Sequence, residues 1–578
     1  MELAAVYHKA DKSCCYALEK NRFLFRIRVK KGDMASVVLH SQDKYLPLSW
    51  QDTRQQTVME RVCSDEYSDY YETELHFQVV CLRYFFELTD QNGERVFYSN
   101  YKFSKEIVTD TDQMFDCPQN LREEERFLLP EWAKNRVVYQ IFPSRFASSR
   151  KVADELWYKA PIGHFDNLQG DLRGVIEHLD HLEELGVEVL YMTPIFRANT
   201  SHKYDTVDYY QIDPSFGTKE DLKELVAKAH ARGMRVLLDG VFNHTSPDFF
   251  AFADVMKYQE KSGYLDWYYI EGFPLIRERG KKPNFKCFSY YGGMPKLNLS
   301  NPKVQDYCIG VARYWIRECG IDGWRLDVGD EISHVFWKRF RREVKEEKPE
   351  ALIIGEVWHY APDFLEGDEW DSVMNYPFKD AVKELLAERS ITVSQFASRL
   401  GFIRGNVHTD VYPVLLNLID SHDCPRFLHE CGGDVSRLKM AAALQLLSPG
   451  MPMIYYGDEY AMEGGKDPDC RRGMVWEESR QNAGAYDWYR RLIRVRKEHP
   501  ALTAGQLVSL QTEDEKGLLR IVKWDGNEEL AVIYNCGTEA AILPEYAGLM
   551  ELLLEKKFEG RLDAMEAAVL VKRDRKAH

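Results

Sequence analysis

Residues 323–331, GWRLDVGDE, set an arginine and an aspartate two positions apart within an apolar run typical of a buried strand. Side chains at positions i and i+2 of a strand point to the same face, so Arg325 and Asp327 should project together. Such a pair is either a buried salt bridge or a carboxylate that a neighbouring guanidinium keeps ionised for chemistry. The rest of the chain has to decide between these two interpretations.

The composition is that of an acidic globular protein with several domains. At 578 residues the chain is too long for one ordinary core, so about two to four domains are expected. A hydrophobic fraction of 45% with 29% charged residues is ordinary for such a protein. The net charge of −16 argues against a nucleic acid or an anionic membrane as partner, because both require a basic surface. The 33 tyrosines, 29 phenylalanines and 12 tryptophans suit a site that stacks on flat, neutral ligands, of which sugar rings are one example.

The sequence predicts a cytoplasmic protein. Residues 1–30 lack the pattern of a signal peptide, and no window approaches the roughly 18 apolar residues of a membrane span. The 12 cysteines are scattered, with Cys14 and Cys15 adjacent, and no C-x-x-C pair occurs. A zinc site or a redox motif is therefore not expected, and buried reduced thiols are the better interpretation.

Both ends of the chain have the pattern of all-β domains. Residues 22–40 alternate around Lys31-Gly32-Asp33, and Asn92-Gly93 between two further apolar runs predicts a hairpin. Residues 1–122 are therefore expected to form an N-terminal β-sandwich, and the polar stretch 118–132 resembles a linker. A second hairpin is predicted around Asp525-Gly526, so a C-terminal β-sandwich is expected at residues 501–578.

Between these ends, strands alternate with helices. Thr218 followed by Asp221 predicts a capped helix start, and Gly186 is the expected end of a helix over 171–186. Continuous apolar segments typical of strands covered on both faces occur at 137–143, 187–194, 235–243, 323–327, 351–357, 372–378, 412–420 and 451–459. Eight such repeats predict an α/β fold, a (β/α)₈ TIM barrel over residues 123–500, with an insertion domain at about 244–300 after the third strand.

Polar residues gather at the ends of these predicted strands, where a barrel of this kind has its active site. They are Asp239 to His244, Arg325 with Asp327, Glu356 to His359, and Asp420 to Asp423. Any one of them could cap a helix or satisfy a loop, but so many acids at one rim would repel one another unless a site uses them. Carboxylates without a metal motif or a Ser-His pair indicate glycoside chemistry, in which one acid protonates the leaving oxygen and another attacks the anomeric carbon.

Four segments in this order, DGVFNH (239–244), GWRLDVGDE, GEVWH (355–359) and LIDSHD (418–423), resemble the signature regions of the α-amylase family, glycoside hydrolase family 13. The resemblance implies Asp327 as the nucleophile, Glu356 as the general acid/base and Asp423 as the acid that stabilises the oxocarbenium-like transition state. It also implies retention of anomeric configuration, for which the two catalytic carboxyl groups lie about 5–5.5 Å apart.

The resemblance further implies residues around the sugar. HKYDTVDYYQIDP (202–214) matches the family after the second strand and would stack Tyr204 on the sugar next to the scissile bond. Contacts to the substrate, or orientation of the acids, are expected from Tyr204, His244, Arg325, Trp358, His359, His422, Arg426 and Lys296. Asp239 and Asn243 are expected to support the architecture.

A subgroup is also indicated. MPKLN (294–298) and residues 457–476 resemble the neopullulanase, cyclomaltodextrinase and maltogenic amylase group, and the N-terminal region is similar to its family 34 carbohydrate-binding module. The resemblance implies cleavage of α-1,4 bonds, with α-1,6 bonds left open, in cyclodextrins, maltooligosaccharides and pullulan. It also implies some transglycosylation and a homodimer formed through the N-terminal domain. The alternatives are an oligo-1,6-glucosidase or another α-glucosidase or sugar isomerase of the family, and a non-catalytic scaffold.

Two departures from the family stand out. Relatives often have V-A-N-E after the nucleophile, whereas this chain has Val328-Gly329-Asp330-Glu331, so Asp330 either adds charge on the acceptor side or is a solvated acid at a helix start. In the loop 144–157, Arg150 and Lys151 stand where relatives have calcium-binding acids. We therefore expect no calcium and no other cofactor, and Asp171 as a helix N-cap.

Overall fold

The computed structural model describes residues 1–46, 53–163, 166–278 and 280–574. Their contacts divide the chain into two compact units. The first comprises Met1–Leu128, Pro362–Gly367 and Ser394–Tyr412, and the second comprises Leu129–Ala361, Asp368–Val393 and Pro413–His578. Within the described ranges, no helix combines the length and the apolar character that a membrane span requires.

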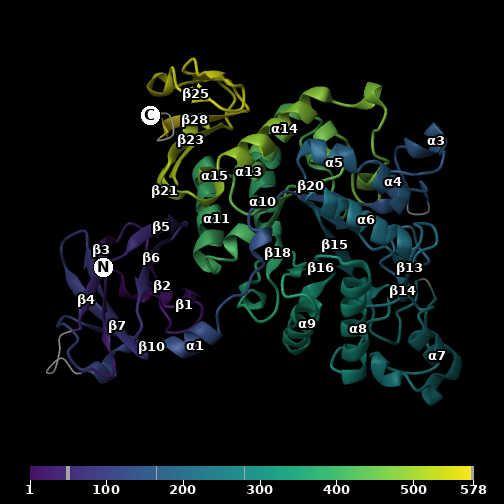
Figure 1. Ribbon diagram of the computed structural model, residues 1–578, viewed down its shortest axis with the longest axis horizontal. Coiled ribbons are helices and arrows are strands. Elements are labelled where there is room, and N and C mark those ends of the chain that lie inside the picture. The colour runs from purple at the N-terminus through teal and green to yellow at the C-terminus, as the bar shows by residue number, and fades with distance from the viewer. Residues whose placement is uncertain (47–52, 164–165, 279, 575–578) are drawn as a thin grey trace. The chain divides into compact units, whose positions relative to one another are not determined.

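The first unit is built on two antiparallel sheets (Figure 1). One has the strand order β1 (Cys15–Glu19), β2 (Arg22–Lys30), β6 (Ser68–His76) and β5 (Glu60–Ser64). The other has the order β4 (Gln55–Val58), β3 (Met34–Asp43), β7 (Cys81–Asp90), β8 (Arg95–Ser99) and β9 (Lys102–Ser104), with β10 (Phe115–Pro118) also paired to β7. Phe25, Leu75 and Phe86 belong to one buried core that draws on both sheets, which confirms the predicted N-terminal β-sandwich.

The two predicted turns of this unit connect different kinds of strand pairs. Asn92-Gly93 joins β7 to β8 as the predicted hairpin, and Gly93 has a φ of +83° that suits glycine. Lys31-Gly32-Asp33 instead carries the chain from one sheet to the other, because β2 pairs with β6 and β3 pairs with β7.

One helix from the barrel region of the sequence makes its contacts in the first unit. The pattern predicts a helix between the sixth and seventh barrel strands, and α11 (Val393–Asn406) is that helix. A Cβ added at Gly401 would lie 1.9 Å from the carbonyl oxygen of Ser64, and one at Gly405 would lie 2.6 Å from the ring of Tyr70. The two glycines therefore allow this helix to approach the end of β5 and the start of β6 closely.

The second unit contains the predicted barrel. Eight parallel strands close on themselves in chain order: β11 (Val138–Ile141), β12 (Val189–Met192), β15 (Arg235–Gly240), β16 (Gly323–Leu326), β17 (Leu352–Gly355), β18 (Ser372–Asn375), β19 (Leu416–Leu418) and β20 (Met451–Tyr455). All of these strands are buried along their whole length except the first residue of β15, as expected for a sheet covered on both sides. The predicted (β/α)₈ barrel is thus confirmed.

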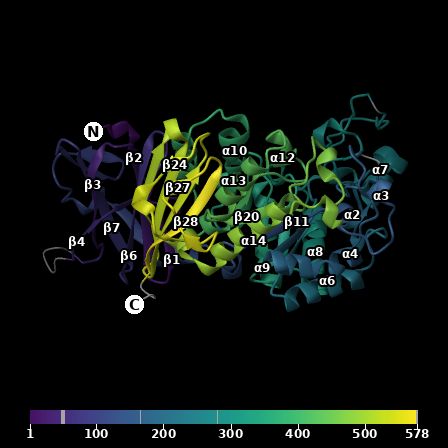
Figure 2. The same cartoon turned by 90° about the horizontal axis from the view of Figure 1, so that it is seen from above.

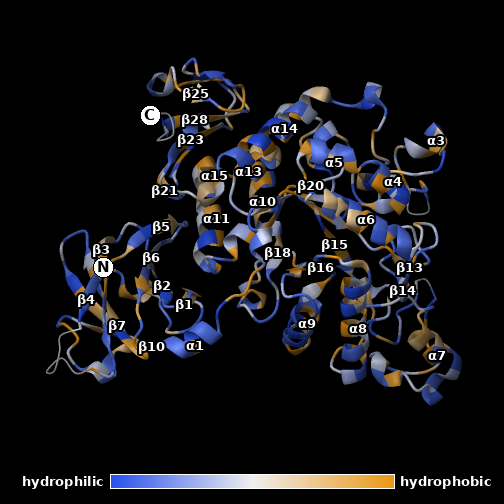
Figure 3. Ribbon diagram, in the orientation of Figure 1, coloured by the Kyte–Doolittle hydropathy of each residue, from blue (hydrophilic) through white to orange (hydrophobic). Residues whose placement is uncertain are grey.

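The covering helices are amphipathic, and α8 and α9 alternate between hydrophobic and hydrophilic colours in Figure 3. The capping box of Thr218 and Asp221 is present at the start of α6, as predicted. Further helices of this unit are α2 (Pro143–Phe146), α6 (Lys219–Ala231), α7 (Phe250–Tyr258), α8 (Pro302–Cys319), α9 (His334–Glu347), α10 (Tyr376–Lys383), α12 (Phe427–Glu430), α13 (Val435–Leu446) and α14 (Ala483–Glu498). Of these, α7 lies in the insertion that follows β15.

The helix predicted over residues 171–186 is two helices. Asp171 caps α4 (Leu172–Glu177) by accepting a hydrogen bond from the N–H of Gly174 at 2.7 Å, which confirms it as an N-cap. The chain breaks at His178, whose Nδ1 hydrogen-bonds the carbonyl of Gly174 at 2.8 Å. A side chain that takes a backbone group in this way competes with the helix ladder. The second helix, α5 (Leu179–Leu185), ends as predicted at Gly186, which has a φ of +94°.

The C-terminal region is all-β, as predicted. Its main sheet has the order β21 (Gln506–Glu513), β22 (Leu518–Trp524), β23 (Glu528–Asn535), β28 (Glu566–Asp574), β25 (Met550–Glu551) and β26 (Lys556–Lys557). The hairpin at Asp525-Gly526 joins β22 to β23. A short pair, β24 (Ala541–Ile542) and β27 (Arg561–Leu562), lies next to β28 (Figure 2) and shares its core. Each sheet lies within one of the three predicted ranges, and the limits of those ranges stay predictions.

Candidate active site

Arg325, at the end of β16, is the centre of a cluster of carboxylates. It is fully buried, and its Nη1 lies 3.1 Å from both carboxyl oxygens of Asp239 and 3.0 Å from Oδ1 of Asp327. Its Nη2 lies 2.7 Å from Oε1 of Glu356. One guanidinium therefore contacts acids from three neighbouring strand ends. The pair of Arg325 and Asp327 is a buried salt bridge that forms part of this larger cluster of acids.

The strand register explains why these side chains meet. In the parallel pair of β15 and β16, Asp239 stands beside Arg325, and in the next pair Leu326 stands beside Gly355. Glu356 therefore follows at the level of Asp327. Gly355 has to be a glycine, because a Cβ there would lie 2.2 Å from the ring of Trp370.

Burial and mutual repulsion govern the charges of this cluster. Burial, and then the facing Glu356, raise the pKa of Asp327 well above its usual value, while Arg325 opposes the rise. Burial also raises the pKa of Asp239 to about 6. The sequence left open whether Arg325 forms a buried salt bridge with Asp327 or keeps this carboxyl group ionised for chemistry. Arg325 favours the ionised form of Asp327, but it is shared with Asp239 and Glu356.

Glu356 is held by two further donors. Its Oε2 accepts a hydrogen bond from the backbone N–H of Val328 at 3.0 Å, and its Oε1 accepts one from the indole of Trp358 at 3.1 Å. Val328 has a φ of +47° and a ψ of +49°, which is a strained conformation for a β-branched residue. The strain accompanies a turn that directs this N–H at the carboxylate.

Asp423 lies on the opposite side of the cluster, after β19. Its Oδ1 accepts a hydrogen bond from Arg471 at 3.0 Å, and its Oδ2 lies 3.1 Å from Nε2 of His422. Arg471 also binds the carbonyl of His422 at 2.7 Å and Asp467 at 2.9 Å. Burial, together with nearby cations, lowers the pKa of His422 well below its usual value, so this imidazole is neutral.

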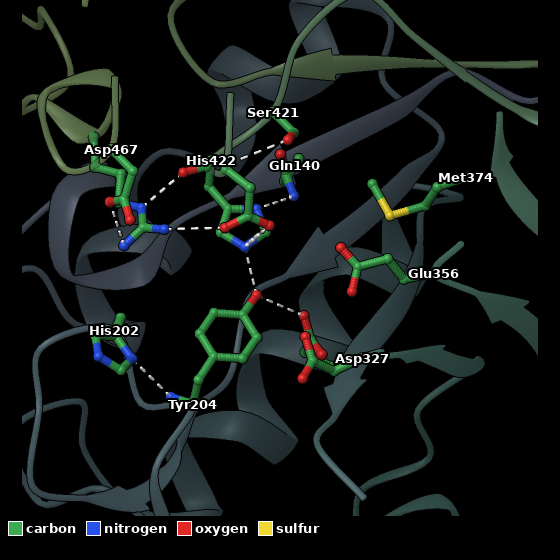
Figure 4. A network of polar contacts seen from close by, with 12 residues as sticks. Gln140, His202, Tyr204, Asp327, Glu356, Met374, Ser421, His422 and Asp467 are labelled. Atoms are coloured by element: carbon green, nitrogen blue, oxygen red, sulfur yellow. Dashed lines mark hydrogen bonds and ion pairs between the residues drawn. The ribbon is translucent and has the colours of Figure 1, made fainter. Parts of the chain in front are cut away.

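Tyr204 links the two sides (Figure 4). Its hydroxyl hydrogen-bonds Nε2 of His422 and, at 3.1 Å, Oδ2 of Asp239. The other ring nitrogen of His422 lies 2.9 Å from the amide nitrogen of Gln140. A polar chain therefore runs from Gln140 on β11, through His422 and Tyr204, to Asp239 on β15.

His244, Asn243 and Lys296 lie where the insertion leaves and rejoins the barrel. His244 is buried, stacks on Phe288 with 5.0 Å between ring centroids, and its Nε2 has no hydrogen-bond partner among the described residues. Burial lowers the pKa of His244 to about 3, so its ring is neutral. The ammonium of Lys296 hydrogen-bonds Asn243 and lies 3.2 Å from Glu331, so it stands apart from the three acids.

Trp358 and His359 lie on the accessible side of the rim, and both are half exposed or more. Trp358 stacks on Tyr376 with 4.3 Å between ring centroids and an angle of 14°. His359 lies 3.8 Å from the carboxylate of Asp330. Asp330 is therefore neither deep in the cluster nor purely solvated, since it faces a histidine of the rim.

Arg426 differs from its expected role as a substrate contact. It is fully buried, and its three nitrogens bind Asp458 at 3.0 Å and the carbonyls of Cys470 at 3.0 Å and Tyr456 at 2.8 Å. Each nitrogen of the guanidinium has a partner inside the protein. We therefore interpret Arg426 as a residue that holds the loop carrying Asp423 in place.

The sequence reasoning missed several residues of the site. Arg471 lies in the segment 457–476 that had been singled out only as a subgroup marker, so its signal was present. Tyr191 donates a hydrogen bond to Asp239 at 2.6 Å from the second barrel strand, and its position near a strand end could have suggested it. Gln140 and the N–H of Val328 carried no signal of their own.

Comparisons with known proteins agree with this fold. The family model described as alpha amylase, catalytic domain, matches residues 140–505. The family model described as alpha amylase, N-terminal ig-like domain, matches residues 1–119. The chain therefore belongs to the α-amylase family of glycoside hydrolases.

Individual relatives cover almost the whole chain. A cyclomaltodextrinase of Geobacillus thermopakistaniensis (strain MAS1) is 42% identical over 94% of this chain and 93% of that protein. Neopullulanase 2 of Thermoactinomyces vulgaris is 41% identical over 93% of this chain and 91% of that protein. A solved cyclomaltodextrinase structure, 38% identical, superposes with a TM-score of 0.91 and covers 99% of this chain and 100% of its own.

Proposed function

We propose that this protein is a retaining α-glucan hydrolase that cleaves α-1,4 bonds, and in addition α-1,6 bonds, of cyclodextrins, maltooligosaccharides and pullulan, with some transglycosylation. The observation that carries the proposal is the single guanidinium of Arg325 within 3.0 Å of Asp327 and 2.7 Å of Glu356. Contact with one side chain brings the two carboxyl groups to the same place, as two acids that act on one glycosidic bond require. A separation of about 5–5.5 Å between them stays a prediction.

In the proposed mechanism, Asp327 attacks the anomeric carbon while Glu356 gives its proton to the glycosidic oxygen. The bond between that carbon and the oxygen breaks, the leaving glucan departs as an alcohol, and the sugar is bound covalently to Asp327. Glu356 then takes a proton from water, whose oxygen attacks the same carbon and releases Asp327. A second sugar hydroxyl in place of water gives transglycosylation.

The remaining residues have supporting roles in this proposal. Asp423, with His422, stabilises the positive charge that develops on the sugar ring. Tyr204 stacks beside the scissile bond. The Nε2 of His244, which has no hydrogen-bond partner in the described ranges, is available to a sugar hydroxyl. Trp358 and His359 contact the sugars on the accessible rim. Lys296 influences substrate binding indirectly, because it holds the side chains of Asn243 and Glu331.

The alternative is an oligo-1,6-glucosidase or another α-glucosidase or sugar isomerase of the family. The main proposal is favoured because relatives spanning nearly the whole chain are named cyclomaltodextrinase, neopullulanase and maltogenic amylase. The test incubates the purified protein with β-cyclodextrin, pullulan and soluble starch in parallel and identifies the products. We expect β-cyclodextrin to be opened faster than starch is cleaved. Much faster cleavage of starch would contradict the subgroup, and release of glucose from isomaltose alone would favour the alternative.

We also propose a cytoplasmic homodimer formed through the N-terminal domain. A relative from Bacillus subtilis, 37% identical over 96% of this chain, is named intracellular maltogenic amylase, which supports the location. Light scattering on the full chain during gel filtration tests the assembly. A mass near twice 67.5 kDa is expected, and a mass of 67.5 kDa at all concentrations would contradict it.

Finally, we propose that the protein needs no calcium and no other cofactor. Asp171, the acid that remains of the relatives' calcium site, is already engaged by the helix start of α4 and by Arg150, whose Nε lies 3.7 Å away. A positively charged side chain next to the carboxylate disfavours a second cation there.

A further inference from the structure

Behind the loop of His422 and Asp423 lie two buried aspartates that the mechanism above does not use. Asp420 and Asp458 follow β19 and β20, are 1% and 2% exposed, and bring their carboxyl groups against one another. Asp420 Oδ2 accepts from the N–H of Phe427 at 2.6 Å, and Asp458 Oδ1 accepts from Arg426 at 3.0 Å. The oxygens left for the mutual contact are therefore Oδ1 of Asp420 and Oδ2 of Asp458, and neither has an N–H or O–H donor in the described part of the chain.

Two acceptors in contact need a hydrogen between them. If both carboxyls were ionised, they would repel one another in a dry environment around one guanidinium, that of Arg426. The other titratable groups near the pair include Lys379, Glu459, Tyr139, Tyr489, Cys424 and Cys431. Lys379 is bound to Asp380 at 2.9 Å, and Glu459 is a further negative charge, so neither group relieves the repulsion directly. Burial raises the pKa of both aspartates, which agrees with a retained proton.

We propose that Asp420 and Asp458 share one proton and that this protonated pair positions His422 and Asp423 for glycoside cleavage, an inference that rests on the proposed function. The proton belongs mainly to Asp420, because Asp458 is the partner that contacts Arg426. The pair holds the loop 420–427 at both ends, through the N–H of Phe427 and through Arg426. Arg426 in turn binds the carbonyl of Cys470, and Cys470 is followed by Arg471, the residue that holds Asp423.

Because the proton is assigned to Asp420, the isosteric variants Asp420→Asn and Asp458→Asn should differ in activity. In Asp420→Asn, the amide oxygen can accept from Phe427 and the amide N–H can donate to an ionised Asp458, so the arrangement of the protonated pair is kept. In Asp458→Asn, Arg426 loses its anionic partner and Asp420 is left ionised without a cation. With β-cyclodextrin as substrate at pH 6, we expect Asp420→Asn to keep kcat within about threefold, while Asp458→Asn and Asp420→Ala lose about tenfold or more in kcat with a smaller change in KM.

The pH profile separates positioning from a merely structural role. Both pKa values are raised, so the proton is kept at low pH and lost as the pH rises through the pKa of the pair. The wild-type kcat should therefore fall on the alkaline side, and Asp420→Asn, which has no such proton to lose, should extend activity to higher pH. Equal losses of kcat in Asp420→Asn and Asp420→Ala with no movement of the alkaline limb would overturn the proposal, as would an Asp420→Asn protein that fails to fold.

A measurement that does not need activity tests the proton directly. Infrared difference spectra of protein labelled with ¹³C-aspartate should show a protonated carboxyl band at neutral pH that loses one component in Asp420→Asn. The surface variant Asp180→Asn should leave the band unchanged. A band identical in wild type and Asp420→Asn would refute the shared proton. If the wild type cleaved none of the glucans, the proposed function would fail while this spectrum still decided the state of the pair.

Discussion

At the scale of single residues, the site holds more carboxyl groups than positive charges to balance them. Arg325 faces Asp239, Asp327 and Glu356, and burial raises the pKa of two of these acids. A retaining glycosidase needs one acid that is ionised and one that carries a proton. A single guanidinium does not balance three buried carboxyl groups, so a proton should stay within the cluster, and the proposed mechanism places it on Glu356.

Replacing the proposed nucleophile should separate activity from folding. We expect Asp327→Asn to lower kcat on β-cyclodextrin by at least about a thousandfold, because no carboxylate is left to attack. The melting temperature should stay the same or rise, since one buried acid is removed from a crowded cluster. Asp180→Asn, which removes an exposed carboxylate, is the control and should keep full activity. Near-normal turnover of Asp327→Asn would remove this residue from its role.

The coupling between the two catalytic acids predicts a shift in pH dependence. The charge of Glu356 is, after burial, the main factor that raises the pKa of Asp327, so Glu356→Gln should lower that pKa. The nucleophile works when ionised, and activity is therefore lost as the pH falls through its pKa. On α-maltosyl fluoride, whose leaving group needs no proton, the acid limb of kcat/KM should move to lower pH in Glu356→Gln. A limb that stays in place or moves upward would show that the two acids are not coupled.

At the scale of elements, α11 has the sequence position of a barrel helix, between the sixth and seventh barrel strands, but it belongs to the first unit by its contacts. Arg404 of this helix binds Glu72 of β6 at 2.9 Å, and Glu72 also accepts from Arg26 of β2 at 2.7 Å. Glu72 and Arg26 are buried, so the three side chains form an ion cluster whose geometry depends on how closely the helix approaches. Gly401 and Gly405 allow that approach.

Filling this contact should cost stability. Gly401→Ala would force the backbone of Ser64 away, and we expect a loss of about 1–3 kcal/mol in the free energy of unfolding from overpacking. Denaturant unfolding followed by circular dichroism measures it. Gly484→Ala in α14 is the matched control, because its Cβ would meet only side-chain atoms at 3.6 Å or more, and it should be neutral or stabilising. Equal effects of the two substitutions would mean that the close approach is not needed.

At the scale of the whole molecule, stability should not depend on calcium. Asp171 is used by the start of α4 and lies 3.7 Å from the Nε of Arg150, so its carboxylate already has partners within the protein. Dialysis against a chelator should therefore shift the melting temperature by less than about 2 °C, because a ligand that does not bind the native state cannot stabilise it. Chelator saturated with calcium is the control. A large drop restored by calcium would place a cation where none is expected.

Much of the architecture could be predicted because it depends on local pattern. The eight apolar strand segments, the capping box at Thr218, the glycine after α5 and both hairpins depend on residues close together in the sequence, so their signals are complete. The break at His178 could not be predicted, because it depends on a side chain that takes a backbone carbonyl instead of extending the helix. The destination of α11 could not be predicted either, since it depends on contacts between segments more than 300 residues apart.

The sequence by itself determined which residues have the chemistry for the site. The carboxylates, histidines and arginine after strands three, four, five and seven are set by the order of the motifs, and parallel strands in a barrel bring their ends to one rim. Only the tertiary structure decided how charge is distributed among them. It shares Arg325 between three acids, assigns Arg471 to Asp423, withdraws Arg426 from the substrate and brings Asp420 against Asp458. The reason is physical: the pKa of a carboxyl group depends on burial and on neighbours a few ångströms away, and sequence spacing fixes neither.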